Sequence, residues 1–229
     1  TYRVGLNMGD QFFSHKDNYT PYKDTPETWP EFIEKFLLKN NIHKIFLFGD
    51  CRYYQHVTRN IANEQNIEVF VFEEGYLRPH FITLEKFGVN GFSSLSRDSS
   101  FYRKLEKKDI PKPQHAQQSK TNMVASATLY YALSNLFTKK YPHYRHHRDF
   151  SAITEFFHGI RAVWRKGLYK LTERSYKTKI TNELSKKYYF VPLQTHNDFQ
   201  ILQHSNYRSI EKFIIEVLES FAHHAPKDT

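Results

Sequence analysis

Cysteine is nearly absent from this sequence, since Cys51 is the only one among 229 residues. One cysteine cannot form an intramolecular disulfide, and it cannot supply the thiolates of a cysteine-based structural zinc site. The sequence therefore favours a reducing compartment, and we expect the protein to be cytoplasmic.

Long hydrophobic runs are lacking as well. No segment approaches the roughly 18 apolar residues that a membrane-spanning helix needs. The opening residues, Thr1-Tyr2-Arg3, do not have the pattern that begins a signal peptide. Any association with a membrane is therefore expected to be peripheral.

Aromatic residues, by contrast, are abundant. The chain contains 20 Phe and 16 Tyr, and 39% of its residues are hydrophobic. Disordered chains are poor in aromatics, so the composition predicts a folded protein with a sizeable core. The length suits one large domain or two small ones.

Apolar runs that alternate with amphipathic segments predict an α/β fold. The expected strands are residues 3–7, 44–48 and 67–72, and the expected helices are residues 28–40 and 53–66. This order favours a parallel, Rossmann-like sheet in which the continuous apolar strand 44–48 is buried. Ligands bind beyond the carboxyl ends of such strands, so the loops 49–52 and 73–80 are candidate sites.

The second half of the chain reads as helices followed by a second strand-helix unit. Residues 110–121 predict a linker, because they contain two prolines and no apolar periodicity. Helices are expected from about 122 to 137 and from about 150 onward. A strand at 187–193 then precedes a polar loop and a helix that carries Ile210 to Phe221. The predicted domains are a Rossmann-like lobe at 1–110, a basic helical insertion at 111–186, and the start of a second Rossmann-like lobe at 187–229.

Positive charge is concentrated in one segment. Residues 139–187 hold 13 lysines and arginines but 4 acidic residues, an excess equal to the net charge of the whole chain, +9. Such a segment contacts nucleic acid, contacts anionic lipid, or is an ordinary charged outer face. Lipid is favoured, because Phe156 and Trp164 lie among the basic residues and no nucleic-acid motif accompanies them. The expected membrane-contact residues are Trp164, Arg161, Arg165, Lys166 and Lys170.

The first candidate site directly follows the predicted strand 67–72. Its sequence is Glu73-Glu74-Gly75-Tyr76-Leu77-Arg78-Pro79-His80. Arg78 offers a planar fork of donors to a carboxylate or phosphate, and His80 exchanges a proton near neutral pH. Gly75 allows a ligand to approach the backbone. The alternative is a solvated turn with local salt bridges.

The second candidate site follows the predicted strand 187–193. Its sequence is Gln194-Thr195-His196-Asn197-Asp198-Phe199-Gln200, with His204 and Ser205 soon after. Asp198 could act as a nucleophile or base, since carboxylates attack anomeric carbons in retaining sugar chemistry. The alternative is a turn with capping side chains, in which Ser205 or Ser209 caps the next helix.

The third candidate is Gly49-Asp50-Cys51-Arg52. Asp50 either caps the helix that begins near Arg52 or holds substrate hydroxyls, and capping is the favoured interpretation. Cys51 is interpreted as a packed residue rather than a nucleophile, because the sequence identifies no partner base. His143, His146 and His147 form a histidine-rich stretch, but a metal site there is not favoured.

Taken in order and spacing, several segments resemble the capsule-export family of the KpsS and LipB type. They are Phe48 to Arg52, Phe72 to Pro79, Ile82 to Glu85, Gly88 to Gly91, and Phe190 to Ser205. The resemblance implies a two-lobed, GT-B-like glycosyltransferase. It also implies the retaining transfer of Kdo from CMP-β-Kdo to phosphatidylglycerol or its lyso form, which starts the linker of group 2 capsules.

The resemblance also implies roles for particular residues. Related Kdo transferases use a carboxylate nucleophile, a role for which Asp198 is the best match and Glu74 the second; His80 is the remaining catalytic candidate. Arg78 and His80 would face the Kdo carboxylate or the acceptor phosphate, and Gln194, Asn197 and Gln200 would hold the donor. The other substrate-binding candidates are Glu73, Gly75, Asp50, Arg52, His204 and Ser205.

The implied partners are a nucleotide-sugar donor, an anionic phospholipid at the inner membrane, and other capsule biosynthesis or export proteins, with no nucleic acid. No cofactor or metal is expected, because a CMP-sugar already carries a phosphate leaving group and the sequence has no Asp-x-Asp motif. The family's glycine-rich opening strand and its Lys-His-His-Pro-type motif are not in the sequence, so the fold is expected to be incomplete at both ends.

Two other functions fit the same sequence. One is a non-catalytic capsule-assembly scaffold that binds anionic lipid through the basic helices. The other is a related transferase that uses a different nucleotide sugar.

Overall fold

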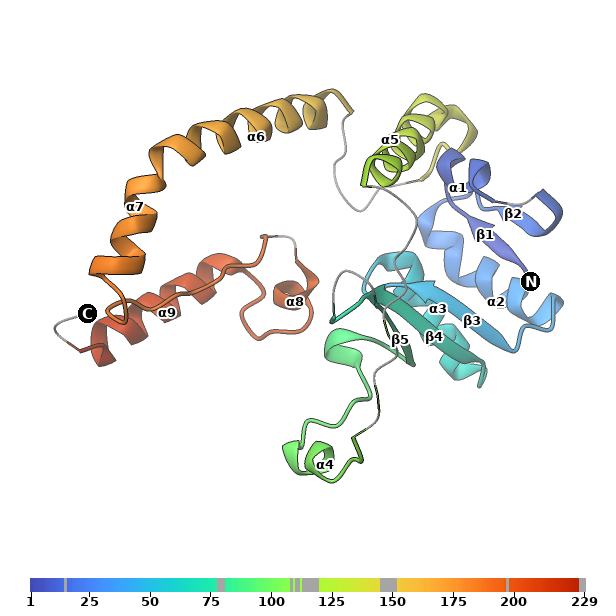
Figure 1. Ribbon diagram of the computed structural model, residues 1–229. Helices are drawn as coiled ribbons and strands as arrows, with labels where there is room; N and C mark the ends of the chain where they lie inside the picture. Colours follow the sequence, from blue (N-terminus) through green and yellow to red (C-terminus); the bar gives the residue numbers. More distant parts are fainter. Residues whose placement is uncertain are drawn as a thin grey trace. The chain divides into compact units, whose positions relative to one another are not determined.

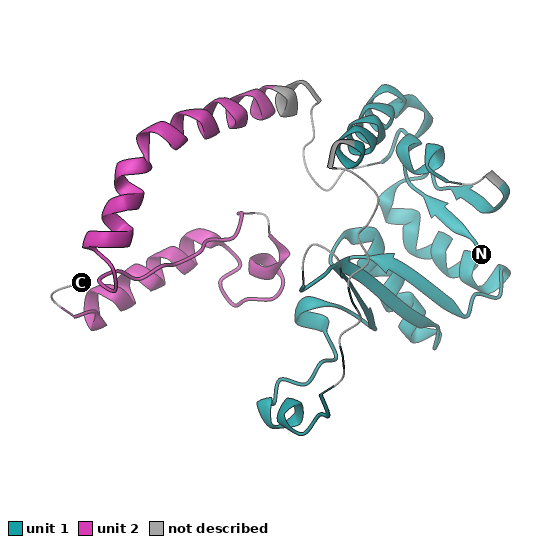
Figure 2. Cartoon of the chain, in the orientation of Figure 1, with its two compact units in different colours: residues 1–148 teal, residues 149–229 magenta. Residues whose placement is uncertain are grey.

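The computed structural model describes residues 1–14, 16–77, 81–107, 109, 112, 120–144, 152–196 and 198–226. The chain divides into two compact units, Thr1–Arg148 and Asp149–Thr229 (Figure 2). The fold is mixed α/β, and every strand that the structure describes lies in the first unit. The boundary between the units falls inside the expected insertion at 111–186, so the three-part division stays a prediction.

The first unit contains two small sheets. Its strands are β1 (Arg3–Gly5), β2 (Tyr19–Pro21), β3 (Lys44–Phe48), β4 (Glu68–Glu74) and β5 (Ile82–Lys86). Its helices are α1 (Met8–Phe12), α2 (Trp29–Lys39), α3 (Tyr53–Glu64), α4 (Ser99–Arg103) and α5 (Lys120–Leu136), with short 3₁₀ turns at 16–18, 26–28, 90–92 and 138–140. The strands and helices expected up to residue 74 are therefore present.

The larger sheet has the order β3-β4-β5 (Figure 1). β3 and β4 are parallel, with Lys44 opposite Glu68 and Phe48 opposite Phe72, and α3 is the crossover between them. β5 returns antiparallel to β4, with Glu74 opposite Ile82. The β3-α3-β4 unit confirms the parallel pairing expected from the sequence, whereas the antiparallel third strand was not predicted.

β1 does not join this sheet. It pairs in parallel with β2, from Arg3 opposite Tyr19 to Gly5 opposite Pro21. An apolar groove of about 770 Å³, lined by residues of β1, α2 and β3, lies between the two sheets. The expectation of one parallel sheet through 3–7, 44–48 and 67–72 was therefore wrong for the first strand.

The core of the first unit lies on one face of the larger sheet. Helices α2 and α3 cover that face (Figure 1). Val69 and Val71 point into it with no exposed surface and pack against Ala62 of α3. Trp29 is 4% exposed and donates its indole N–H to Thr58 Oγ1 over 3.2 Å, which satisfies the indole inside the core.

The opposite face of this sheet carries aromatic side chains. Phe46 and Phe48 of β3 are 58% and 59% exposed, and Phe46 stacks on Phe70 at 5.3 Å between ring centroids. Side chains alternate between the two faces of a strand, and helices cover one face only. The expectation that 44–48 is buried on both sides was therefore wrong within the described residues.

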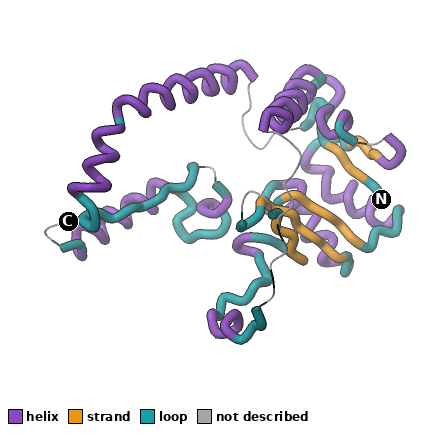
Figure 3. The backbone as a smooth tube through the Cα atoms, in the orientation of Figure 1, coloured by secondary structure: helices purple, strands orange, loops and turns teal. Residues whose placement is uncertain are grey.

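The second unit is helical and irregular. Its helices are α6 (Ala152–Thr172), α7 (Arg174–Thr178), α8 (Phe199–Leu202) and α9 (Ile210–His224), with a π-helical turn at Lys179–Glu183. Residues 187–193 form a loop (Figure 3) that lines a groove of about 680 Å³ on α9. The strand expected there was wrong: β-branched and aromatic residues favour a strand only when a partner strand pairs with it.

Candidate functional site

The carboxyl ends of β3 and β4 meet at one edge of the larger sheet. Gly49, directly after β3, has a φ of +71°, a conformation that glycine adopts without strain. Its N–H donates to the carbonyl oxygen of Phe72 over 2.8 Å. A Cβ on Gly49 would lie 3.9 Å from Glu73 Oε2. The candidate segments that begin at Gly49 and Glu73 therefore adjoin each other.

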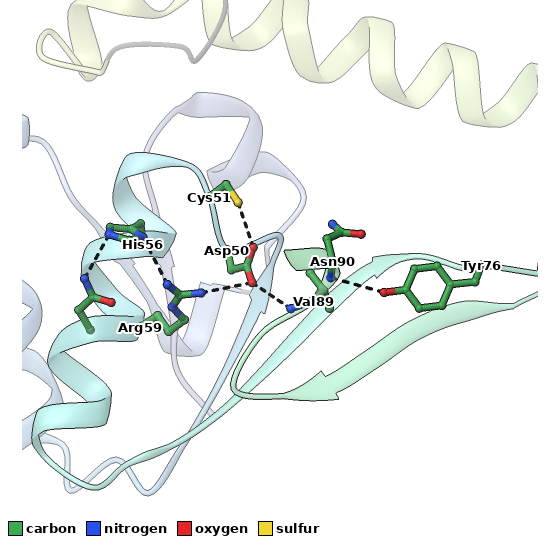
Figure 4. Close-up of polar contacts among 8 residues, drawn as sticks. Asp50, Cys51, His56, Arg59, Tyr76, Val89 and Asn90 are labelled. Atoms are coloured by element: carbon green, nitrogen blue, oxygen red, sulfur yellow. Dashed lines mark hydrogen bonds and ion pairs between the residues drawn. The ribbon is translucent and has the colours of Figure 1, made fainter. Parts of the chain in front are cut away.

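Asp50 is a charged residue that is almost fully buried at this edge, at 2% exposure. Its Oδ2 accepts a hydrogen bond from the Val89 N–H at 3.0 Å and pairs with Arg59 Nη1 at 3.4 Å (Figure 4). Capping, the favoured interpretation for Asp50, was wrong, because Arg52 is the N-cap of α3 and the Asp50 carboxylate bonds elsewhere. Contact between Asp50 and a substrate stays a prediction.

The guanidinium of Arg59 completes this buried group. It lies 4.0 Å from the centroid of the Phe92 ring, and its Nη2 is 3.5 Å from His56 Nδ1. Only 9% of the Arg59 side chain is exposed. Sequence reasoning missed Arg59, since an arginine in the middle of a predicted helix looks like an ordinary surface residue until its buried partner is known.

Cys51 donates its S–H to Asp50 Oδ1 over 3.3 Å. Burial, aided by the hydrogen bond to Asp50, raises the pKa of the Cys51 thiol to about 12. A thiol with this pKa is protonated at neutral pH and is a poor nucleophile. This agrees with the interpretation of Cys51 as a packed residue.

The loop after β4 is tied back onto β5. A Cβ on Gly75 would overlap the carbonyl oxygen of Phe81. Glycine at this position therefore allows the Phe81 backbone to approach closely. The Tyr76 hydroxyl donates to Glu85 Oε1 over 3.2 Å. The same hydroxyl accepts from the Asn90 N–H at 3.4 Å (Figure 4). Gly75 was also expected to let a ligand approach the backbone, and that role stays a prediction.

Three more predicted residues of the first unit surround this edge. Glu73 is half-buried and its Oε1 accepts the N–H of Glu74, whose own side chain is exposed. Arg52 is half-buried at the start of α3. Carboxylates of Glu73 and Glu74 and the cation of Arg52 therefore belong to the end of the sheet where α/β proteins bind ligands. Arg78 and His80 lie outside the described residues.

Asp198 belongs to the second unit, where it is the N-cap of α8. Its Oδ1 accepts the N–H of Gln200 over 2.8 Å, and the residue is half-buried. This is the capping arrangement that the sequence left open as the alternative. A carboxylate has a second oxygen with its own lone pairs, so the cap does not use up its capacity to react. Asn197 lies outside the described residues.

The remaining predicted residues of this block differ in exposure. Gln194 is exposed, whereas Gln200 and His204 are half-buried. Ser205 donates its hydroxyl to the carbonyl oxygen of Ile201 over 2.7 Å. The cap of α9 is Ser209, which accepts the N–H of Lys212 at 3.2 Å. Of the two serines considered as caps, Ser209 therefore has that role.

A polar network at the carboxyl end of β1 was not foreseen. Asn7, 1% exposed, donates to the Tyr130 hydroxyl over 2.8 Å, and this hydroxyl donates to Asp10 Oδ1 over 2.8 Å. Ser134 donates to Asn7 Oδ1 over 2.9 Å. Burial raises the pKa of Tyr130, and the Asp10 carboxylate raises it further. These bonds fasten α5 onto α1 and its N-cap across 120 or more residues of sequence, which no local pattern encodes.

The expected membrane-contact residues lie on α6. Trp164 is 65% exposed, and Arg161, Arg165, Lys166 and Lys170 are all exposed. Arg165 Nε donates to the Tyr169 hydroxyl over 2.7 Å. None of the helices in the described part of the chain is long and apolar enough to cross a membrane.

No group of three or more His, Cys, Asp or Glu residues that could hold a metal ion occurs among the residues that the structure describes. Of the histidine-rich stretch, His143 is described, whereas His146 and His147 lie outside the described residues.

The sequence is similar to those of known capsule proteins. The chain is 39% identical over 226 residues to the capsule polysaccharide export protein KpsS of Escherichia coli, covering 99% of this chain and 58% of that protein. It is 32% identical over 234 residues to the capsule polysaccharide modification protein LipB of Neisseria meningitidis serogroup A, covering 100% of this chain and 56% of that protein.

The chain thus spans a little more than half the length of these relatives. No solved structure matches it. Residues 43–229, well over half of the chain, match the family described as capsule polysaccharide biosynthesis protein. The chain therefore belongs to the capsule polysaccharide biosynthesis family, as its resemblance to the KpsS and LipB type implied.

Proposed function

We propose that this chain is part of a retaining glycosyltransferase that moves Kdo from CMP-β-Kdo to phosphatidylglycerol or its lyso form. The observation that carries the proposal is that β4 ends in two carboxylate residues, Glu73 and Glu74, at the edge where the carboxyl ends of the parallel strands β3 and β4 meet. Carboxylates in that position suit sugar chemistry. Membership of the capsule family supports a capsule precursor as the product.

Retention requires two displacements at the anomeric carbon of Kdo. In the first, a carboxylate attacks that carbon, the bond to the CMP phosphate breaks, and a glycosyl ester forms. In the second, a lipid hydroxyl attacks the same carbon, the ester bond breaks, and a base takes the hydroxyl proton. Asp198 is proposed as the nucleophile, Glu74 as the alternative nucleophile and His80 as the base.

The two units have different parts in this proposal. Arg52, Arg78 and the end of the β3-β4-β5 sheet would face the acidic sugar or the acceptor phosphate, because guanidinium groups bind such oxyanions in a planar fork. Gln194, Asn197 and Gln200 would hold the CMP donor, and His204 and Ser205 are further candidates for substrate binding. A GT-B-like architecture, with two Rossmann-like lobes in the whole protein, is the matching fold proposal.

The variants Asp198→Asn and Glu74→Gln test the catalytic assignment. In the full-length protein, transfer from CMP-Kdo to a phosphatidylglycerol analogue should fall at least about a thousandfold in the variant that lacks the nucleophile. Glu211→Gln, an exposed carboxylate on α9, is the matched control and should keep full activity. Loss of thermal stability with retained transfer in both variants would contradict the assignment.

No cofactor or metal is part of the proposal. The donor carries its own phosphate leaving group, so transfer should continue in the presence of EDTA. Abolition of transfer by EDTA, with rescue by a divalent ion, would show that the donor site needs a metal.

A second candidate is favoured by the exposed, basic helix α6. A non-catalytic scaffold that works with other capsule proteins at the inner membrane would use this helix to bind anionic lipid. It would show no affinity for CMP or CMP-Kdo, whereas the transferase would bind both. A transferase for another nucleotide sugar would instead prefer that donor over CMP-Kdo in direct competition.

A further inference from the structure

α6 presents an apolar stripe to solvent. Phe157, Ile160, Trp164 and Leu171 recur at helical spacing and are 63%, 53%, 65% and 79% exposed, and Leu168 completes the same stripe. Five large apolar side chains on one face of an exposed helix are costly in water. Some apolar environment is therefore expected to cover this face.

Basic residues line one border of the stripe, and another lies well beyond the other border. At 100° per residue, Arg161 and Arg165 project along one border of the stripe and Lys170 lies beyond the other border, whereas Lys166 points away from its centre. The sequence from Phe156 to Thr172 contains no acidic residue. The partner of this face should therefore be apolar at its centre and negatively charged around it.

An anionic bilayer has this combination of properties. Helices with an apolar face, a tryptophan on that face and basic residues beside it lie in the membrane plane, with the apolar face a few ångströms below the lipid phosphates. A helix of 21 residues is about 30 Å long. α6 does not qualify as a membrane-spanning helix, because it is not apolar enough to cross a membrane.

We propose that α6 lies flat in the surface of an anionic membrane. Phe157, Ile160, Trp164, Leu168 and Leu171 enter the acyl region. Arg161, Arg165 and Lys170 contact the lipid phosphates, and Lys166 faces water. This orientation separates Lys166 from the other residues expected to contact the membrane, and it does not depend on the transfer reaction.

Fluorescence of the full chain tests the proposal directly. The chain has two tryptophans, and Trp29 is 4% exposed in the core of the first unit, so a change on adding vesicles reports Trp164. Vesicles of phosphatidylcholine with phosphatidylglycerol should shift the emission to shorter wavelength and protect Trp164 from acrylamide. Vesicles of phosphatidylcholine alone should do so far less. The Trp164→Phe variant should lose the shift but still sediment with the vesicles.

Two pairs of variants test the orientation. Ile160→Glu places a charge in the centre of the stripe and should weaken vesicle binding about tenfold or more. Ala162→Glu places the same charge on the opposite side of the same helix and should weaken it far less. Arg161→Ala with Arg165→Ala should weaken binding more than Lys166→Ala with a second substitution at an exposed lysine outside α6, such as Lys35→Ala.

All of these side chains are exposed, so the variants should keep the melting temperature of the parent chain. Equal effects of Ile160→Glu and Ala162→Glu would overturn the proposal, because the contact would then depend on charge alone. An unchanged Trp164 emission on bound vesicles would also overturn it. A concentration-dependent dimer that Ile160→Glu disrupts, without vesicle binding, would show that a second copy covers the stripe instead.

Discussion

At the residue scale, Asp50 joins three parts of the first unit. Its carboxylate binds the Val89 N–H in the loop after β5, Arg59 in α3 and the thiol of its neighbour Cys51. Both members of the Asp50–Arg59 pair are buried. Removal of one partner would leave the other charge inside the protein without compensation, which is the costly way to break a buried ion pair.

Asp50→Ala is therefore expected to lower the free energy of unfolding of the first unit by about 3 kcal/mol. Asp50→Asn should cost less, because an amide oxygen still accepts the Val89 N–H. Urea unfolding followed by Trp29 fluorescence in a Trp164→Phe background measures both. Glu31→Gln, which breaks an exposed ion pair with Lys35, is the control and should change nothing measurable. Equal stability of Asp50→Ala and the parent would refute this role of Asp50.

Cys51 offers a test by pH. Burial and the hydrogen bond to Asp50 raise its thiol pKa from 9.0 to about 12, so the thiolate is disfavoured in the folded chain. Stability from the neutral thiol is fully present below pH 9 and is lost as pH rises toward 12. Alkylation of the folded chain by iodoacetamide should therefore be slow at pH 8 and still be accelerating at pH 10. A rate that levels off by pH 9 would contradict the raised pKa.

At the element scale, the β4-β5 pairing depends on Gly75. A side chain there would collide with the Phe81 backbone. Gly75→Ala is expected to destabilise the first unit by about 2 kcal/mol or more, as measured by urea unfolding. Gly159→Ala in α6, where a Cβ meets no atom within 4 Å, is the matched control and should raise helix content instead. A neutral Gly75→Ala would mean that the loop can rearrange at no cost.

The docking of α5 gives a second test at this scale. Tyr130→Phe removes the hydroxyl that links Asn7 and Asp10, and should cost about 1 to 3 kcal/mol because buried polar groups lose their partner. Amide hydrogen exchange should become faster in α5 while the β3-β4-β5 sheet keeps its protection. Tyr131→Phe, at the next position of the same helix, shows whether the effect is specific to Tyr130.

Elements with a strong local pattern could be predicted from the sequence. Hydrophobic periodicity predicts the strand at 44–48, the helices α2 and α9, and the parallel β3-α3-β4 unit. Two features did not follow. β5 pairs antiparallel because Gly75 admits a close backbone approach. Residues 187–193 have strand composition but no strand to pair with among the described residues.

The candidate site, too, could be predicted only in part. Its position at the ends of β3 and β4 could be predicted, because ligands bind beyond parallel strands. The partners of individual side chains could not: Asp50 contacts Arg59 and Val89, which are 9 and 39 residues away. Such contacts depend on tertiary packing, which gave Asp50 a connecting role in place of the expected helix cap.

At the scale of the whole molecule, the candidate residues belong to two units. Asp50, Glu73 and Glu74 lie in Thr1–Arg148, and Asp198 lies in Asp149–Thr229. The chain spans a little more than half of its KpsS and LipB relatives, and it belongs with them to the capsule polysaccharide biosynthesis family. The transfer reaction is therefore best tested in the full-length protein.

The most direct test of the proposed function is mass analysis of the acceptor lipid. Full-length protein is incubated with CMP-Kdo and a fluorescent phosphatidylglycerol analogue. The lipid is then analysed by mass spectrometry for an added Kdo. The transferase proposal predicts lipid that carries Kdo with the wild-type protein and none with Asp198→Ala. Unmodified lipid with the wild-type protein, while it still binds phosphatidylglycerol vesicles, would contradict the proposal and favour the scaffold.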